Sequence, residues 1–120
     1  MTILIVLAGL MGAAGIVLAA ASAHGTPGSG LDSAGYLLAI HAVGVIGGVA
    51  LLQQSLLSRP IGTVAIGGFV LGAALFAGDV AARAYLGHRL FPMAAPTGGM
   101  ILIISWLVVA VAAALASRAG

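Results

Sequence analysis

The chain alternates long apolar stretches with short polar segments. Four apolar stretches cover about residues 2–23, 34–57, 61–86 and 97–116. A helix that crosses a bilayer needs about 20 mostly apolar residues, so each stretch is long enough to span. The segments between them are rich in Gly, Pro and Ser, which end helices. The pattern predicts an all-α integral membrane four-helix bundle with short loops, in a single domain of residues 1–120.

The composition leads to the same class of protein. Hydrophobic residues make up 62% of the chain and charged residues 5%, whereas a soluble domain carries about 25% charged residues. Such a chain cannot cover a water-facing surface. The absence of lysine and of any run of basic residues argues against nucleic-acid binding. The absence of cysteine excludes disulfides, iron–sulfur clusters and thiolate metal sites, and we expect no cofactor and no metal.

Small residues recur at helical spacing along the predicted spans. In lipid, such residues let two helix backbones approach closely. Gly44 and Gly48 lie four residues apart in the second span, as Gly68 and Gly72 do in the third. We predict helix-packing roles for seven glycines: Gly12, Gly15, Gly44, Gly48, Gly68, Gly72 and Gly98.

The ionisable side chains gather toward one end of the predicted bundle, in a candidate polar cluster of His24, His41, Asp79 and Arg83. Asp79 and Arg83 lie four residues apart and therefore share a helix face. His41 lies about 9 Å inside the predicted second span and needs a partner there, so we expect it to contact Asp79. Two interpretations of the Asp79–Arg83 pair stay open: mutual neutralisation that fixes the rotation of the helix, or a proton or ligand site.

Two side chains outside the cluster have expected structural roles. Asp32 or Ser33 precedes the predicted second span and can cap that helix by accepting a hydrogen bond from a free amide. Trp106 falls near the centre of the fourth span rather than at a membrane border. We expect it to pack against neighbouring helices.

The arginines predict an orientation. Four spans place both termini on one side, together with Arg59 and Arg118. Arg83 and Arg89 lie on the other side, where Asp79 offsets Arg83. The positive-inside bias then predicts cytoplasmic termini.

The order of short motifs resembles the YgdD-type family of small four-helix inner-membrane proteins (domain of unknown function 423). The matching pieces are Ala23-His24-Gly25, Ile40-His41-Ala42, Leu71-Gly72 through Phe76-x-Gly78, and Ala95-Pro96-Thr97-Gly98-Gly99, then Trp106. The resemblance implies the fold and a bacterial inner-membrane location, and no activity. The family often has Ser where this chain has Asp79, which suggests that the ion pair is this protein's own device.

Three functions remain open. The favoured one is a non-catalytic membrane protein, in contact with membrane lipids. It acts as an accessory or structural subunit of a larger inner-membrane complex, for example a respiratory one, or forms a homo-oligomer. The second is a small transporter or channel that uses the polar cluster. The third is a haem- or quinone-binding membrane subunit, since histidine can ligate haem iron. We predict no catalytic residues and no enzyme activity.

Overall fold

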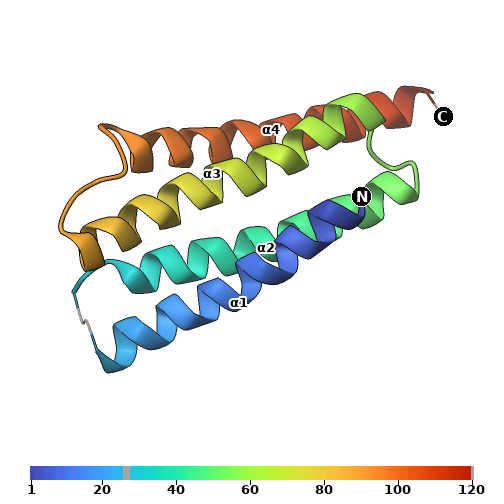
Figure 1. The fold of residues 1–120 in the computed structure, drawn as a ribbon. Helices are drawn as coiled ribbons and strands as arrows, with labels where there is room; N and C mark the ends of the chain where they lie inside the picture. Colours follow the sequence, from blue (N-terminus) through green and yellow to red (C-terminus); the bar gives the residue numbers. More distant parts are fainter. Residues whose placement is uncertain (26–27, 120) are drawn as a thin grey trace.

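The computed structural model describes residues 1–25 and 28–119, which form four α-helices (Figure 1). The helices are α1 (Thr2–His24), α2 (Leu31–Gln53), α3 (Arg59–Leu86) and α4 (Ala94–Ala119). All four are long and apolar enough to cross a membrane, which confirms the predicted fold class. At 1.5 Å per residue they are about 35 to 42 Å long, against a hydrocarbon core of about 30 Å.

Helix α2 lies closer to the N-terminus than the sequence pattern predicted. It begins at Leu31 and ends at Gln53, where the pattern gave residues 34–57. Gly30 occupies the N-cap position with φ +82°, a left-handed conformation that glycine adopts without steric cost. The prediction that Asp32 or Ser33 caps this helix was therefore wrong. The Asp32 carboxylate instead accepts the Ser33 N–H at 2.8 Å inside the first turn.

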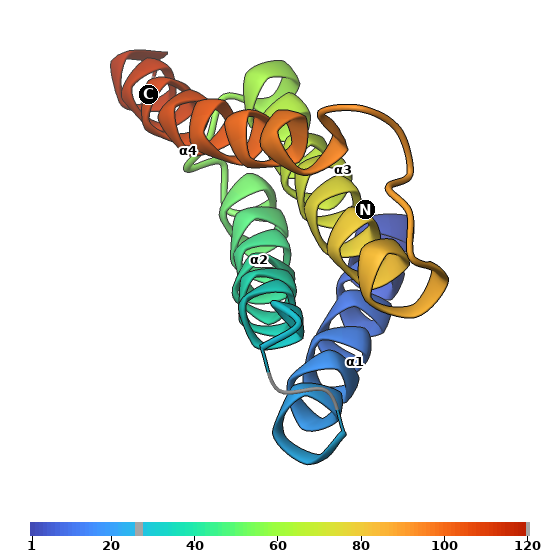
Figure 2. The same ribbon diagram turned by 90° about the vertical axis from the view of Figure 1, so that its left-hand side faces the viewer.

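The helices form two hairpins that meet along α2 and α3. Helix α1 packs on α2, α4 packs on α3, and the two hairpins join through α2 and α3. Seen along the bundle, α1 and α4 lie on opposite sides (Figure 2). The most apolar stretches of α2 and α3 bury 44% and 39% of their residues, against 17% in α1 and in α4. The two middle helices are therefore the centre of the molecule.

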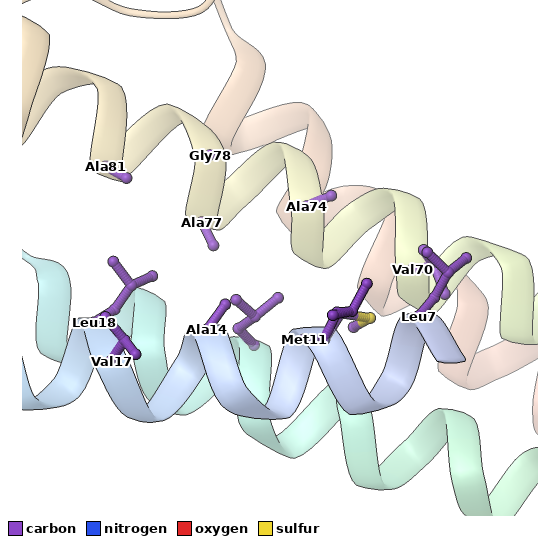
Figure 3. Close-up of a pocket in the computed structure, with 12 residues that line it drawn as sticks. Leu7, Met11, Ala14, Val17, Leu18, Val70, Ala74, Ala77, Gly78 and Ala81 are labelled. Carbon is purple, nitrogen blue, oxygen red and sulfur yellow. The ribbon is translucent and has the colours of Figure 1, made fainter. Parts of the chain in front are cut away.

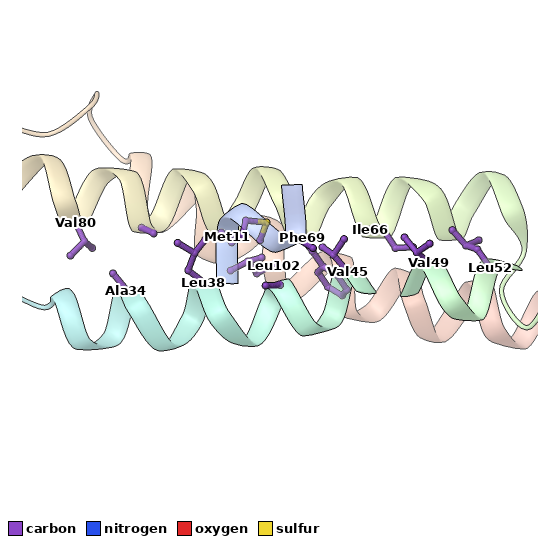
Figure 4. Close-up of a cluster of buried hydrophobic side chains, with 14 of the residues drawn as sticks. Met11, Ala34, Leu38, Val45, Val49, Leu52, Ile66, Phe69, Val80 and Leu102 are labelled. Carbon is purple, nitrogen blue, oxygen red and sulfur yellow. The ribbon is translucent and has the colours of Figure 1, made fainter. Parts of the chain in front are cut away.

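The core is apolar and runs along the α2–α3 contact (Figure 4). Val45 and Val49 from α2 lie beside Ile66 and Phe69 from α3, and Leu102 of α4 joins them. Phe69 is the largest fully buried side chain of this set, with 1% of its surface exposed.

Each hairpin contains a reciprocal contact between two glycines. A Cβ atom added to Gly15 would lie 2.7 Å from the Gly35 carbonyl oxygen, and one added to Gly35 would lie 2.6 Å from the Gly15 oxygen. Gly72 and Gly98 repeat this arrangement between α3 and α4, at 2.8 and 2.6 Å. Both contacts are backbone against backbone, so no side-chain movement can make room for a methyl group.

The other glycines that the sequence singled out divide into two groups. At Gly48 a Cβ would lie 2.7 Å from the Ile66 side chain, and at Gly68 it would meet the Ser105 hydroxyl. Gly12 and Gly44 differ, because an added Cβ would have its nearest neighbours at 3.8 and 3.5 Å. These two positions have room for alanine.

Candidate functional site

One end of the bundle carries most of the ionisable groups. The α1–α2 and α3–α4 connections lie at this end, and the α2–α3 connection lies at the other end with both termini (Figure 1). His24 is the last residue of α1 and is exposed. Asp32 lies in the first turn of α2, and Arg83 lies in the last turn of α3.

Asp79 is a fully buried carboxylate with backbone partners. Its exposed fraction is 0%. Its Oδ1 accepts the Leu90 N–H at 3.0 Å, and its Oδ2 accepts the Ala95 N–H at 3.2 Å. Ala95 is the second residue of α4, where the free amides and the helix dipole favour a negative charge. Asp79 therefore ties α3 to the α3–α4 connection and to the start of α4, an arrangement we call the Asp79 latch.

Arg83 is the charged neighbour of the Asp79 latch. Its Nε atom lies 3.8 Å from Asp79 Oδ2, and 44% of its side chain is exposed. This distance is longer than that of a charge-assisted hydrogen bond, which is about 2.7–2.9 Å. The predicted pair is thus formed, with the two amides as the closer partners of the carboxylate. This geometry favours the structural interpretation of the pair.

His41 lies near the middle of α2 and has both ring nitrogens engaged. Its Nε2 lies 3.0 Å from Trp106 Nε1, and its Nδ1 lies 2.7 Å from the Leu37 carbonyl oxygen. An indole N–H can only donate and a carbonyl can only accept. His41 Nε2 therefore accepts, Nδ1 carries the hydrogen, and the ring is neutral.

An aromatic group of three rings surrounds this bond. Phe69 packs against Trp106 with ring centroids 4.5 Å apart, and against His41 at 5.4 Å with an edge-on geometry. The rings come from α2, α3 and α4. They connect the two hairpins, with His41 and Phe69 buried and Trp106 46% exposed, which gives Trp106 the helix-contact role that the sequence indicated.

The structure separates the predicted polar cluster into parts, and the expected His41–Asp79 contact is not formed. Because α2 starts at Leu31, His41 lies about 15 Å from the start of its helix at 1.5 Å per residue. Asp79 lies about 10 Å from the end of α3 by the same measure and turns toward α4. Within the described residues, His24 has no hydrogen bond to either of them.

Several functional partners were not identified from the sequence. The sequence does not single out the Leu90 and Ala95 amides as partners of Asp79, because every residue except proline has a backbone N–H. Features of the sequence could have identified Phe69 and Gly35. Phe69 is one of three phenylalanines, and Gly35 with Ala39 repeats the spacing of Gly15 with Ala19.

An apolar groove lies between α1 and α3, over part of α2 (Figure 3). Its volume is about 510 Å³. Figure 3 shows Met11, Ala14 and Leu18 of α1 facing Ala77 and Ala81 of α3 across it. We call it the α1–α3 groove. Its lining is almost wholly apolar, so it can receive only apolar surface. Over residues 1–25 and 28–119, three or more His, Cys, Asp or Glu side chains do not gather as a metal site.

Comparison with known protein families gives a match over most of the chain. The model of a family described as "Protein of unknown function (DUF423)" matches residues 18–99. The match includes the Asp79 latch and His41, and it ends before Trp106. Comparisons with curated proteins and with solved structures give no match.

Proposed function

The chain belongs to the DUF423 family of proteins of unknown function, and we propose its role from its geometry. It is a non-catalytic accessory or structural subunit of a larger inner-membrane complex, for example a respiratory one. The observation that carries this proposal is the α1–α3 groove, which offers an apolar surface along α1 from Leu7 to Leu18.

The α3 wall of the groove resembles the helix contacts that the chain makes with itself. Ala74 and Gly78 lie four residues apart on this wall, and so do Ala77 and Ala81. Small residues at this spacing let a second helix approach closely in lipid. Gly15 and Ala19 use the same spacing against α2. The wall therefore suits a transmembrane helix of another subunit.

The bonding of the polar residues also supports a structural role. Asp79 and His41 use their acceptor atoms within the chain. Among the described residues, every buried side-chain nitrogen or oxygen has a hydrogen-bond partner. A catalytic or ion-conducting site needs polar groups that are free to meet a ligand. These groups hold helices together instead.

The proposal is tested with two neighbouring residues of α1. Ala14 lines the groove, whereas Ala13 is exposed outside it. We expect the wild-type protein and Ala13→Leu to copurify with a membrane protein in constant stoichiometry in mild detergent. Ala14→Leu places a larger side chain in the groove and should lose that partner. Ala74→Leu tests the opposite wall.

The proposal fails if the wild-type protein isolated from its native membrane is a lone monomer. It also fails if Ala14→Leu and Ala74→Leu both retain the partner at the wild-type ratio. Circular dichroism of each variant shows whether the helical content is kept.

We also propose that the protein lies in a bacterial inner membrane with cytoplasmic termini. Arg59 begins α3 and Arg118 lies in the last turn of α4, at the end that holds both termini (Figure 1). At the other end, Asp79 lies beside Arg83. The excess of positive charge is therefore on the side of the termini, which supports this orientation.

A further inference from the structure

An amphipathic hollow lies at the end of the molecule that holds the termini. The α2–α3 connection and the last turns of α4 border two hollows of about 310 and 360 Å³. Ser55 and Ala116 line both, so the two adjoin. The Ser58 N–H donates to the Ala112 carbonyl oxygen at 2.9 Å and holds the connection against α4. We call the pair of cavities the termini-end hollow.

The lining of the termini-end hollow is amphipathic. Ser55 and Ser58 of the connection supply hydroxyl groups, and Arg59 at the start of α3 supplies a guanidinium group. Leu56 and Leu115 supply an apolar wall. The Ser58 hydroxyl does not cap α3, although Ser58 is the N-cap residue of that helix. Hydrogen-bond donors therefore lie next to apolar side chains at the depth where a spanning helix begins.

The charge of this end favours an anion. Both acidic residues of the chain, Asp32 and Asp79, lie toward the opposite end. Among the described residues, no side-chain carboxylate contacts Arg59. The side-chain ion pair in this part of the chain joins Arg83 to Asp79, toward the opposite end. A guanidinium group binds phosphate oxygens in a bidentate way, and anionic lipid headgroups surround such an arginine at a cytoplasmic membrane surface.

We propose that the termini-end hollow binds one anionic phospholipid. The lipid phosphate contacts the Arg59 guanidinium and the hydroxyls of Ser55 and Ser58. The upper part of an acyl chain lies against Leu56 and Leu115, whose side chains are exposed. The apolar wall makes this a lipid site rather than a site for free phosphate, because a free phosphate ion gains nothing from apolar side chains.

Native mass spectrometry of the purified full-length chain tests the proposal. Phosphatidylglycerol and phosphatidylcholine are added at equal concentration to the wild-type protein, to Arg59→Gln and to Arg89→Gln, and inorganic phosphate is added to separate samples of each. Arg89 is an exposed arginine of the α3–α4 connection at the opposite end, so it is the matched control. We expect the wild-type protein and Arg89→Gln to retain phosphatidylglycerol in preference to phosphatidylcholine. Arg59→Gln should bind phosphatidylglycerol about tenfold more weakly, since it loses a charge-assisted contact.

Three results would overturn the proposal. They are equal retention of the two lipids by the wild-type protein, wild-type retention of phosphatidylglycerol by Arg59→Gln, and binding of inorganic phosphate as tight as that of phosphatidylglycerol. If Arg59→Gln does not fold, Ser58→Ala replaces it, and retention by Ser58→Ala that equals the wild type then counts against the site.

Discussion

At the scale of single residues, Asp79 joins parts of the chain that are far apart in sequence. Its carboxylate meets amides 11 and 16 positions further on. The sequence predicted the Asp79–Arg83 pair because both side chains lie on one helix, where spacing fixes distance. The backbone partners depend on the path of the α3–α4 connection, which side-chain spacing does not encode.

Removing the Asp79 latch should destabilise the α3–α4 hairpin. In Asp79→Ala the Leu90 and Ala95 amides lose their acceptor, and unsatisfied buried groups cost about 1–3 kcal/mol each. Since the Leu90 bond is only partly buried, we expect a loss of about 1–4 kcal/mol of unfolding free energy, together with faster hydrogen–deuterium exchange in residues 87–95. Exchange by mass spectrometry measures the second effect directly.

Arg83→Gln is the control for this prediction. Because Arg83 is 44% exposed and its Nε lies 3.8 Å from the carboxylate, its removal should cost less than about 1 kcal/mol. If Arg83→Gln accelerates exchange in residues 87–95 as much as Asp79→Ala does, the ion pair rather than the amide bonds holds the connection.

His41 is a second residue whose partner the sequence left undetermined. Its position inside a span predicted that it needs a partner, and this reasoning was correct. The choice of Asp79 as that partner was wrong, because the true start of α2 places His41 near the middle of the helix. A start three residues earlier changes both the depth and the neighbours of every polar side chain on the helix.

The His41–Trp106 bond should appear as a coupling in a double-mutant cycle. His41→Leu removes the acceptor, Trp106→Phe removes the donor, and the double variant removes both. Interhelical hydrogen bonds in membranes contribute about 0.6 kcal/mol on average and about 1.7 at most, so we expect about 1 kcal/mol. Unfolding by sodium dodecyl sulfate in mixed micelles, followed by circular dichroism, gives the four free energies. Additive effects would mean that the bond contributes nothing.

At the scale of helices, close packing depends on a few positions where backbones touch. The sequence pattern indicated small residues on every span, and Gly15, Gly72 and Gly98 do lie at backbone contacts. The same pattern also selected Gly12 and Gly44, where a methyl group fits. Spacing identifies a helix face, but the point at which two axes come closest depends on how the helices cross.

Gly98 and Gly99 are adjacent residues of α4 that should respond in opposite ways to alanine. At Gly98 an added Cβ would lie 2.6 Å from the Gly72 oxygen, whereas at Gly99 it would have open space. Gly98→Ala should destabilise the protein by about 1–3 kcal/mol, as overpacking does. Gly99→Ala should be neutral or stabilise it by up to about 1 kcal/mol through helix propensity. Thermal unfolding in detergent compares the two, and equal melting temperatures would contradict the α3–α4 contact.

At the scale of the complete fold, composition and length predicted the number of helices and their approximate positions. Four apolar stretches and few charges required four spanning helices, and α3 ends at Leu86 as predicted. The pairing of α1 with α2, of α2 with α3 and of α3 with α4 could not be derived in this way. All four helices are apolar around most of their surface, so no single face predicts its neighbour.

The proposed orientation predicts the behaviour of fusions at the C-terminus. A green fluorescent protein fused there should fluoresce in a bacterial host, and an alkaline phosphatase fused there should be inactive. Removing the charge tests whether the arginines set the orientation. Arg59→Gln combined with Arg118→Gln removes the positive excess and should raise phosphatase activity. An active phosphatase on the unaltered chain would reverse the assignment.

The three-ring group has a practical consequence for studies of this protein. Trp106 is the only tryptophan in the chain, and its indole lies against rings of α2 and α3. Its intrinsic fluorescence therefore comes from a place where side chains of both hairpins meet. A change in the tryptophan emission of the unlabelled wild-type protein should therefore report that the two hairpins separate, even when the helices stay folded.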